Sequence, residues 1–129
     1  MAGFSDYLET AVLNHVFGGS SYTAPTTLYV ALYTSAPSDT GGGTEVSGGA
    51  YARQTATFTV SGGTASNTAA IEYSTATADY GTVVAVGVFD ALTSGNLLAY
   101  GTLTTSKTVS TGDVFRFNAS ALDLSLIHI

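Results

Sequence analysis

The sequence predicts a mainly β fold, an antiparallel β-sandwich or barrel of about six to eight strands with one N-terminal α-helix. Three observations lead to this prediction. Apolar residues recur at every second position in several short segments, Gly-containing turns separate these segments, and one segment near the start has helical spacing instead. The 129 residues include no cysteine, so the fold must be held by its hydrophobic core without disulfides.

The predicted helix covers residues 5–17. Asp6 and Glu9 have the spacing of a capping box, and Gly18-Gly19 supplies a stop signal. Between them runs an apolar stripe that needs a partner, and we expect the sheet of the same domain to cover it. The stripe consists of Leu8, Ala11, Val12, His15 and Val16.

The strands are predicted from a period of two. Arg53–Val60 alternates apolar residues with threonines, which predicts a strand with one buried face. Thr82–Phe89 is apolar on both faces, which is typical of a central strand covered on both sides. The full set is Thr27–Tyr33, Arg53–Val60, Thr68–Tyr73, Thr82–Phe89, Leu97–Leu103 and Val114–Asn118, with Leu122 and Leu124 in a last strand.

Gly-rich connections complete the pattern. Pro37–Gly49 is a long loop, and hairpin-type turns are expected at Ser61–Gly63, Ser94–Asn96 and Thr111–Asp113. No internal repeat is present, and the length suits one domain, which we assign to residues 1–123.

The charge balance excludes several partners. Only 9% of residues are charged, and three Lys and Arg residues face nine Asp and Glu residues. So few cations argue against nucleic acid and anionic membranes as partners. No apolar run is long enough to insert in a membrane, and no basic segment precedes one as in a secretory signal. The residues that replace the missing charges are Thr, Ser, Gly, Ala and Tyr. They are compatible with a subunit that packs in an assembly, and equally with the ordinary surface of a β-rich protein.

A search for chemistry predicts no catalytic, cofactor-binding or metal-binding residue. His15 is interpreted as a satisfied or edge-facing core histidine, and no Gly-x-Ser-x-Gly elbow is present. Gly41–Gly43 lacks the residues of a phosphate loop, and Asp90–Asn96 lacks those of a calcium loop. A hydrolase, the remote alternative, would need a pair of carboxylates in positions that turns or solvation explain equally well. The candidates are Glu45, Glu72, Asp79 and Asp90.

The aromatic residues leave two interpretations open. The chain has eight tyrosines, six phenylalanines and no tryptophan. Tyrosine is favoured both in protein–protein interfaces and in the aromatic platforms that bind sugars. The candidate subunit or glycan contacts are Tyr29, Tyr33, Tyr51 and Tyr80. A carbohydrate-binding, lectin-like module that recognises the host surface is therefore an alternative function.

Seven segments in order resemble a family of short phage virion proteins termed tail fiber proteins. They are Ser5–Gly19, Leu28–Asp39, Thr44–Gln54, Ser66–Ala70, Thr75–Gly81, Val86–Gly101 and Leu103–Asp113. The resemblance implies a non-enzymatic structural component of a siphovirus-like virion, assembled in the host bacterial cytoplasm. It also implies a homo-oligomer, with trimeric symmetry expected, that contacts other virion proteins. A capsid-decorating protein has the same size and character, so head and tail locations both stay open.

The end of the chain departs from this family. From the resemblance we expect a final strand of the form Asp-Leu-x-Ile-x-Leu. Instead the chain closes with Leu-Ser-Leu-Ile-His-Ile over residues 124–129. This hexapeptide resembles the translation of a transposon sequencing adapter. We therefore interpret it as an adapter-derived tail on a sequence assembled from metagenomic reads, and we read no function from His128.

Overall fold

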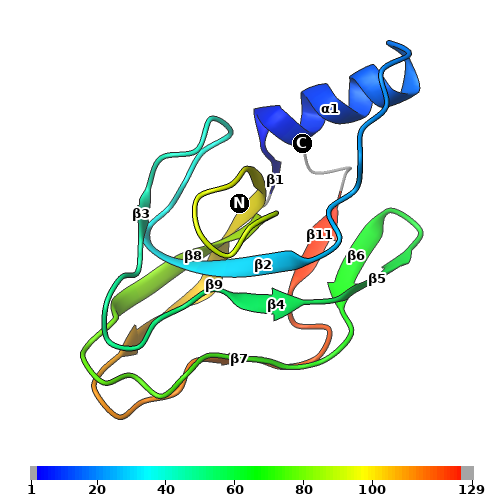
Figure 1. The fold of residues 1–129 in the computed structure, drawn as a ribbon. Coiled ribbons are helices and arrows are strands. Elements are labelled where there is room, and N and C mark those ends of the chain that lie inside the picture. Colours follow the sequence, from blue (N-terminus) through cyan, green and yellow to red (C-terminus); the bar gives the residue numbers. More distant parts are fainter. Residues whose placement is uncertain (1–2, 126–129) are drawn as a thin grey trace.

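The computed structural model describes residues 3–125, which form antiparallel sheets and one helix (Figure 1). This confirms the predicted class; the described sheets do not close into a barrel. The elements are β1 (Gly3–Phe4), α1 (Asp6–Val16), β2 (Leu28–Ser35), β3 (Thr44–Glu45), β4 (Gln54–Ala56), β5 (Phe58–Ser61), β6 (Thr64–Asn67), β7 (Ile71–Glu72), β8 (Gly81–Phe89), β9 (Leu97–Val109), β10 (Arg116–Phe117) and β11 (Asp123–Ser125).

The main sheet has the strand order β1-β9-β8-β2-β3, with β4 also paired to β2. Its centre is β8, whose Gly87 pairs with Ala31 of β2 on one side and with Tyr100 of β9 on the other. Val83 and Ala85 of β8 are fully buried, as expected for a central strand with apolar residues on both faces.

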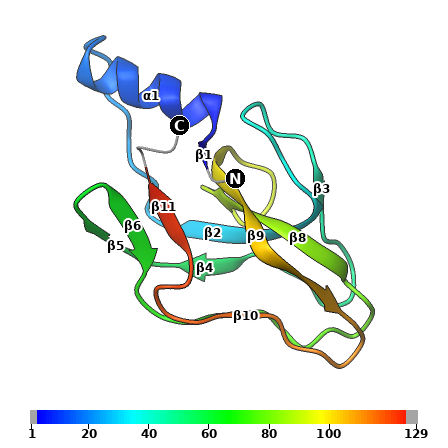
Figure 2. The same ribbon diagram turned by 180° about the vertical axis from the view of Figure 1, so that it is seen from behind.

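Two smaller sheets, β10-β7 and β11-β6-β5, accompany the main sheet (Figures 1 and 2). Residues beside their strands complete the main core, in which Tyr73 and Phe115 join Val30 and Leu32 of β2. The opposite face of the main sheet carries a smaller cluster. Its members are Ala31, Tyr33, Ala85 and Phe89, with Val84 and Leu97 packed against them.

The strand predicted over Arg53–Val60 is divided in two. It breaks at Thr57, where the chain leaves β2 and pairs with β6 instead. The predicted alternation fails for this reason: Ala56 is buried in the main core, but Val60 is 72% exposed on β5. β6 was not predicted, because its sequence Thr-Ala-Ser-Asn has no apolar alternation.

The helix lies where it was predicted, but its cap and its packing differ. Ser5 is the N-cap and its Oγ accepts a hydrogen bond from the Leu8 N–H at 3.2 Å, so Asp6 is the first helical residue. The apolar stripe is covered only in part: Leu8, Ala11 and Val12 are half-buried, whereas His15 and Val16 are exposed. Figure 1 shows why: α1 projects beyond the end of the sheets. Within the described chain, no helix has the length and apolarity needed to cross a membrane.

Candidate functional site

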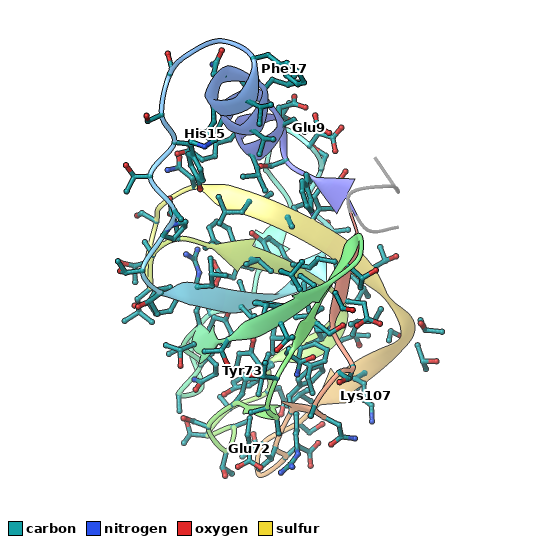
Figure 3. All side chains as sticks on the ribbon, turned by 90° about the vertical axis from the view of Figure 1, so that its right-hand side faces the viewer. Glu9, His15, Phe17, Glu72, Tyr73 and Lys107 are labelled. Atoms are coloured by element: carbon teal, nitrogen blue, oxygen red, sulfur yellow. The ribbon has the colours of Figure 1, made fainter. Side chains whose placement is uncertain are left out.

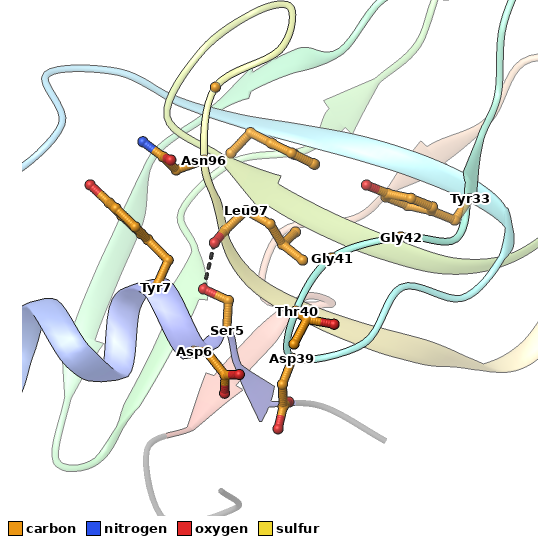
Figure 4. Close-up of a pocket in the computed structure, with 12 residues that line it drawn as sticks. Ser5, Asp6, Tyr7, Tyr33, Asp39, Thr40, Gly41, Gly42, Asn96 and Leu97 are labelled. Carbon is orange, nitrogen blue, oxygen red and sulfur yellow. Dashed lines mark hydrogen bonds between the residues drawn. The ribbon is translucent and has the colours of Figure 1, made fainter.

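A cleft lies where α1 leaves the main sheet (Figure 4). It has a volume of about 500 Å³ and is formed by three segments that are distant in the sequence. These are the start of α1, the loop that follows β2, and the end of the loop between β8 and β9. The lining residues are Ser5, Asp6, Tyr7, Tyr33, Asp39, Thr40, Gly41, Gly42, Phe89, Gly95, Asn96 and Leu97.

Hydrogen bonds hold the three walls in place. Ser5 is 2% exposed; its Oγ donates to the Leu97 carbonyl, and its N–H donates to the Leu98 carbonyl at 2.8 Å. The Asp6 N–H donates to the Asp39 carbonyl at 2.8 Å, which ties α1 to the loop after β2. Since these bonds use backbone groups and a buried hydroxyl, the shape of the cleft is largely set by the fold.

Aromatic and aliphatic side chains form the floor of the cleft. Tyr33 and Phe89 come from β2 and β8, and both are almost fully buried. They approach each other over Gly87, where a Cβ atom would meet Leu97 Cδ1 at 2.9 Å and Tyr33 Cε1 at 3.0 Å. Gly87 therefore permits this packing because it has no side chain.

The walls carry negative charge. Asp6 and Asp39 belong to the lining, and none of its residues is Lys or Arg. The Tyr100 hydroxyl donates a hydrogen bond to the Asp39 carboxylate, and this bond raises the pKa of Tyr100 to about 12. The cleft therefore disfavours anionic ligands and suits neutral or cationic ones.

An ion pair packs against Phe89 of the cleft. Arg53 donates two hydrogen bonds of 2.9 Å to the Glu45 carboxylate, and its guanidinium lies 3.7 Å from the centre of the Phe89 ring. Burial raises the pKa of Glu45, but the bonds from Arg53 and Tyr51 outweigh it and leave the pKa lowered. The interpretation of Glu45 as a residue of a loose loop was wrong, because it belongs to β3.

The remaining candidate carboxylates have separate partners. Asp79 accepts hydrogen bonds from the Thr111 N–H and hydroxyl, and Asp90 accepts two from Asn96. Glu72 forms an exposed ion pair with Arg116 at 3.5 Å. Among the residues that the structure describes, no group of three or more His, Cys, Asp or Glu residues could hold a metal ion.

The four candidate tyrosines are largely withdrawn from solvent. Tyr33 and Tyr80 are each 4% exposed, and Tyr29 and Tyr51 are half-buried. The Tyr51 ring stacks on Tyr73 at 6.1 Å, and its hydroxyl accepts from the Leu32 N–H and donates to Glu45. This favours a structural role for Tyr51, while the contact roles of all four tyrosines stay predictions.

The cleft has no signature in the sequence. Ser94–Asn96 has the pattern of a turn and Gly41–Gly43 that of a loop, but no pattern indicates that Tyr7, Asp39 and Leu97 meet. Only the order of strands in the main sheet brings them together. His15 lies outside the cleft and is exposed, so the expectation of a core position was wrong, although its Nδ1 is satisfied by a hydrogen bond from the Tyr22 N–H at 3.0 Å.

Comparison with known proteins gives one family. A family model described as Podophage GP4 fiber I protein gp80 matches residues 3–125. No curated protein matches the chain. Residues 126–129, with His128, lie outside both the match and the described residues, so the adapter-derived tail stays an expectation.

Proposed function

Because the chain belongs to the family of Podophage GP4 fiber I protein gp80, we propose that it is a tail-associated fibre protein of a phage particle. The resemblance to phage fibre proteins is thereby confirmed, and the chain is a member of a phage virion structural family. The observation that carries the proposal is the extent of the match, which spans residues 3–125 of 129. The siphovirus-like particle stays a prediction, since the family is named for a podophage protein.

The proposed role is structural and not catalytic. Glu45 is committed to Arg53, Asp79 to Thr111 and Asp90 to Asn96, so these carboxylates serve the fold. The hydrogen bonds around Ser5 join α1 to the main sheet and make one module. This supports a building block that is positioned by its neighbours in the virion.

The proposed partners are further copies of this chain and other virion proteins. Three Lys and Arg residues in the whole chain support neither nucleic acid nor an anionic membrane as a partner. We propose assembly in the host cytoplasm, where a chain without cysteine folds independently of redox conditions.

Capsid decoration is the alternative location. A decorating protein binds across subunit junctions and stabilises the shell, because it adds binding free energy to the assembled state alone. The size and the low charge of the chain suit this role as well. The description of the matching family as a fiber protein favours a location in a tail fibre over one on the capsid.

The cleft favours a second candidate function, the binding of a host-surface saccharide. Asp6, Asp39 and Asn96 can hydrogen-bond sugar hydroxyls around the exposed ring of Tyr7, in a volume that suits a small ligand. The absence of Lys and Arg from the lining selects neutral or amino sugars. A glycan array tests this with the isolated chain: Tyr7→Ala should abolish binding, and Val114→Ala, an exposed residue remote from the cleft, should retain it. Equal binding by both variants, or by neither the chain nor its variants, would reject the saccharide site.

Removal of the gene tests the main proposal. Particles produced without this chain should keep their DNA-filled heads and lose a fibre in electron micrographs, and supplying the chain in trans should restore it. Intact fibres on particles without the chain would contradict the proposal. Heads that become unstable while the fibres remain would favour decoration instead.

A further inference from the structure

The loop between β8 and β9 fixes the orientation of Asn96, which lines the cleft. The Asp90 carboxylate accepts a hydrogen bond from the Asn96 N–H at 2.8 Å and another from its Nδ2 at 3.0 Å. A carboxylate can only accept hydrogen bonds, so the amide nitrogen of Asn96 has to face Asp90 and the Oδ1 atom lies on the other side of the amide. Asn96 therefore has its oxygen available as an acceptor for a ligand.

Two further acceptors, the carboxylates of Asp6 and Asp39, lie together at one edge of the cleft. The hydrogen bond of 2.8 Å from the Asp6 N–H to the Asp39 carbonyl joins the two backbones, and Figure 4 shows both side chains on the same side of the cleft. The nearby Ser5 hydroxyl is already used, because it donates to the Leu97 carbonyl and accepts from the Leu8 N–H. The carboxylates therefore favour a ligand that supplies hydrogen-bond donors.

The negative charge of the cleft is not balanced by a cation. Among the described residues that line it none is Lys or Arg, and Arg53, which packs against the floor, is held in its own ion pair. The hydrogen bond to Asp39 is the largest cause of the raised pKa of Tyr100, and the charges of Glu9 and Asp6 raise this pKa further. Three carboxylates therefore act on the same end of the molecule, which favours a donor that carries a positive charge.

A protonated amino group has the chemistry that this edge of the cleft requires. It carries a positive charge and only donors, and hydrogen bonds between ionised partners are about twice as strong as neutral ones. We propose that the cleft binds a saccharide with a free amino group, whose ammonium lies between the carboxylates of Asp6 and Asp39. The sugar ring packs on Tyr7, which is 43% exposed, and its hydroxyls donate to the Oδ1 atom of Asn96. The proposal deepens the saccharide binding proposed above and rests on it.

Nuclear magnetic resonance titration of the isotope-labelled full chain tests this with a short glucosamine oligomer and its N-acetylated counterpart. The N-acetylated form has an uncharged nitrogen with a single donor, so we expect the free-amine form to bind at least about 10-fold more tightly. Asp6→Asn and Asp39→Asn should each weaken binding of the free-amine form about 5- to 10-fold and change that of the N-acetylated form by less than about 2-fold. The amide that replaces the Asp39 carboxylate can still accept the hydrogen bond from Tyr100, so the fold is retained.

Glu72→Gln is the matched control, because Glu72 is an exposed carboxylate at the opposite end of the molecule from Glu9 (Figure 3). It removes the same charge as the other two variants and should leave both affinities unchanged. Equal losses for all three variants would show an effect of net charge alone and would overturn the proposal. Equal binding of the two oligomers would overturn it while the saccharide site stands, and binding of neither would reject that site as well. The location of the chain in the particle is decided separately by the gene-removal experiment.

Discussion

Arg53 and Glu45 face each other in a bidentate ion pair, with Nε and Nη2 each 2.9 Å from a different carboxylate oxygen. The Nη1 group of Arg53 donates instead to the carbonyls of Ala91 and Ser94, at 3.0 and 2.8 Å. One side chain therefore joins β3 to the loop between β8 and β9. The side chain of Arg53 is 7% exposed and that of Glu45 25%, so the pair is shielded from most of the solvent.

Replacing Arg53 with Met should destabilise the fold strongly. The substitution leaves the Glu45 carboxylate with the Tyr51 hydroxyl but without its cationic partner, and it removes the Arg53 donor of two loop carbonyls, so we expect a loss of about 3 kcal/mol in the free energy of unfolding. Urea denaturation measures this. The control is Arg116→Met, which removes an exposed ion pair and should change stability by at most about 0.5 kcal/mol. Similar losses for the two variants would contradict the structural role of Arg53.

The same pair gives the fold an acid-sensitive component. The pKa of Glu45 is lowered in the folded chain, so its contribution is complete above the unfolded pKa of about 4.3 and disappears as the pH falls through the folded value. Wild type should therefore be more stable than Glu45→Gln at neutral pH, and this difference should shrink below about pH 4. Urea midpoints of both proteins across this range provide the measurement. A difference that is independent of pH would refute the assignment.

Asn67 should be essential for the C-terminal part of the fold. It is 1% exposed, and its side chain donates to the carbonyls of Ala69 and Asn118 and accepts from the Leu122 N–H. Asn67→Ala removes the side-chain partner of the Ala69 carbonyl and of the Leu122 N–H, while the Asn118 carbonyl keeps its bond from the Ala121 N–H, and the substitution should cost about 3 kcal/mol. Amide hydrogen exchange should locate the loss around β6 and β11. The exposed Asn14→Ala is the control, and protection around β6 that survives Asn67→Ala would disprove this role.

Gly87 should tolerate no side chain. Its backbone has no positive φ, so Gly87→Ala tests the close packing against Leu97 and Tyr33 alone. We expect a loss of about 1–3 kcal/mol, measured by thermal or urea unfolding. Gly3→Ala is the control, because a Cβ atom there meets Tyr100 at an ordinary 3.5 Å. An unchanged stability for Gly87→Ala would mean that this layer is less tightly packed than the structure has it.

Much of the fold follows from local patterns, and the site does not. The helix, the central strand and the turns were predicted because periodicity and Gly residues report on nearby backbone. The second half of β9, with Thr104–Thr108, was missed because polar residues on an exposed edge have no apolar period. Likewise, nothing local distinguishes Val60, exposed on β5, from Ala56, buried on β4. The difference depends on which strand each one pairs with.

The cleft could not be predicted for the same reason. Ser5, Asp39 and Leu97 meet because β1 pairs with β9 and the loop after β2 reaches α1. The bond from Ser5 to Leu97 joins residues 92 positions apart, and a single sequence carries no direct signal for such a contact. The burial of Tyr33 and Tyr80 was also hidden, since tyrosine is common both in cores and on contact surfaces.

A cryo-electron microscopy map of the purified phage particle tests the central claim most directly. We expect density on the tail, in a fibre, into which the sheets and α1 of residues 3–125 fit. Density for this chain on the surface of the head, or its absence from the particle, would contradict a role as a tail-fibre protein.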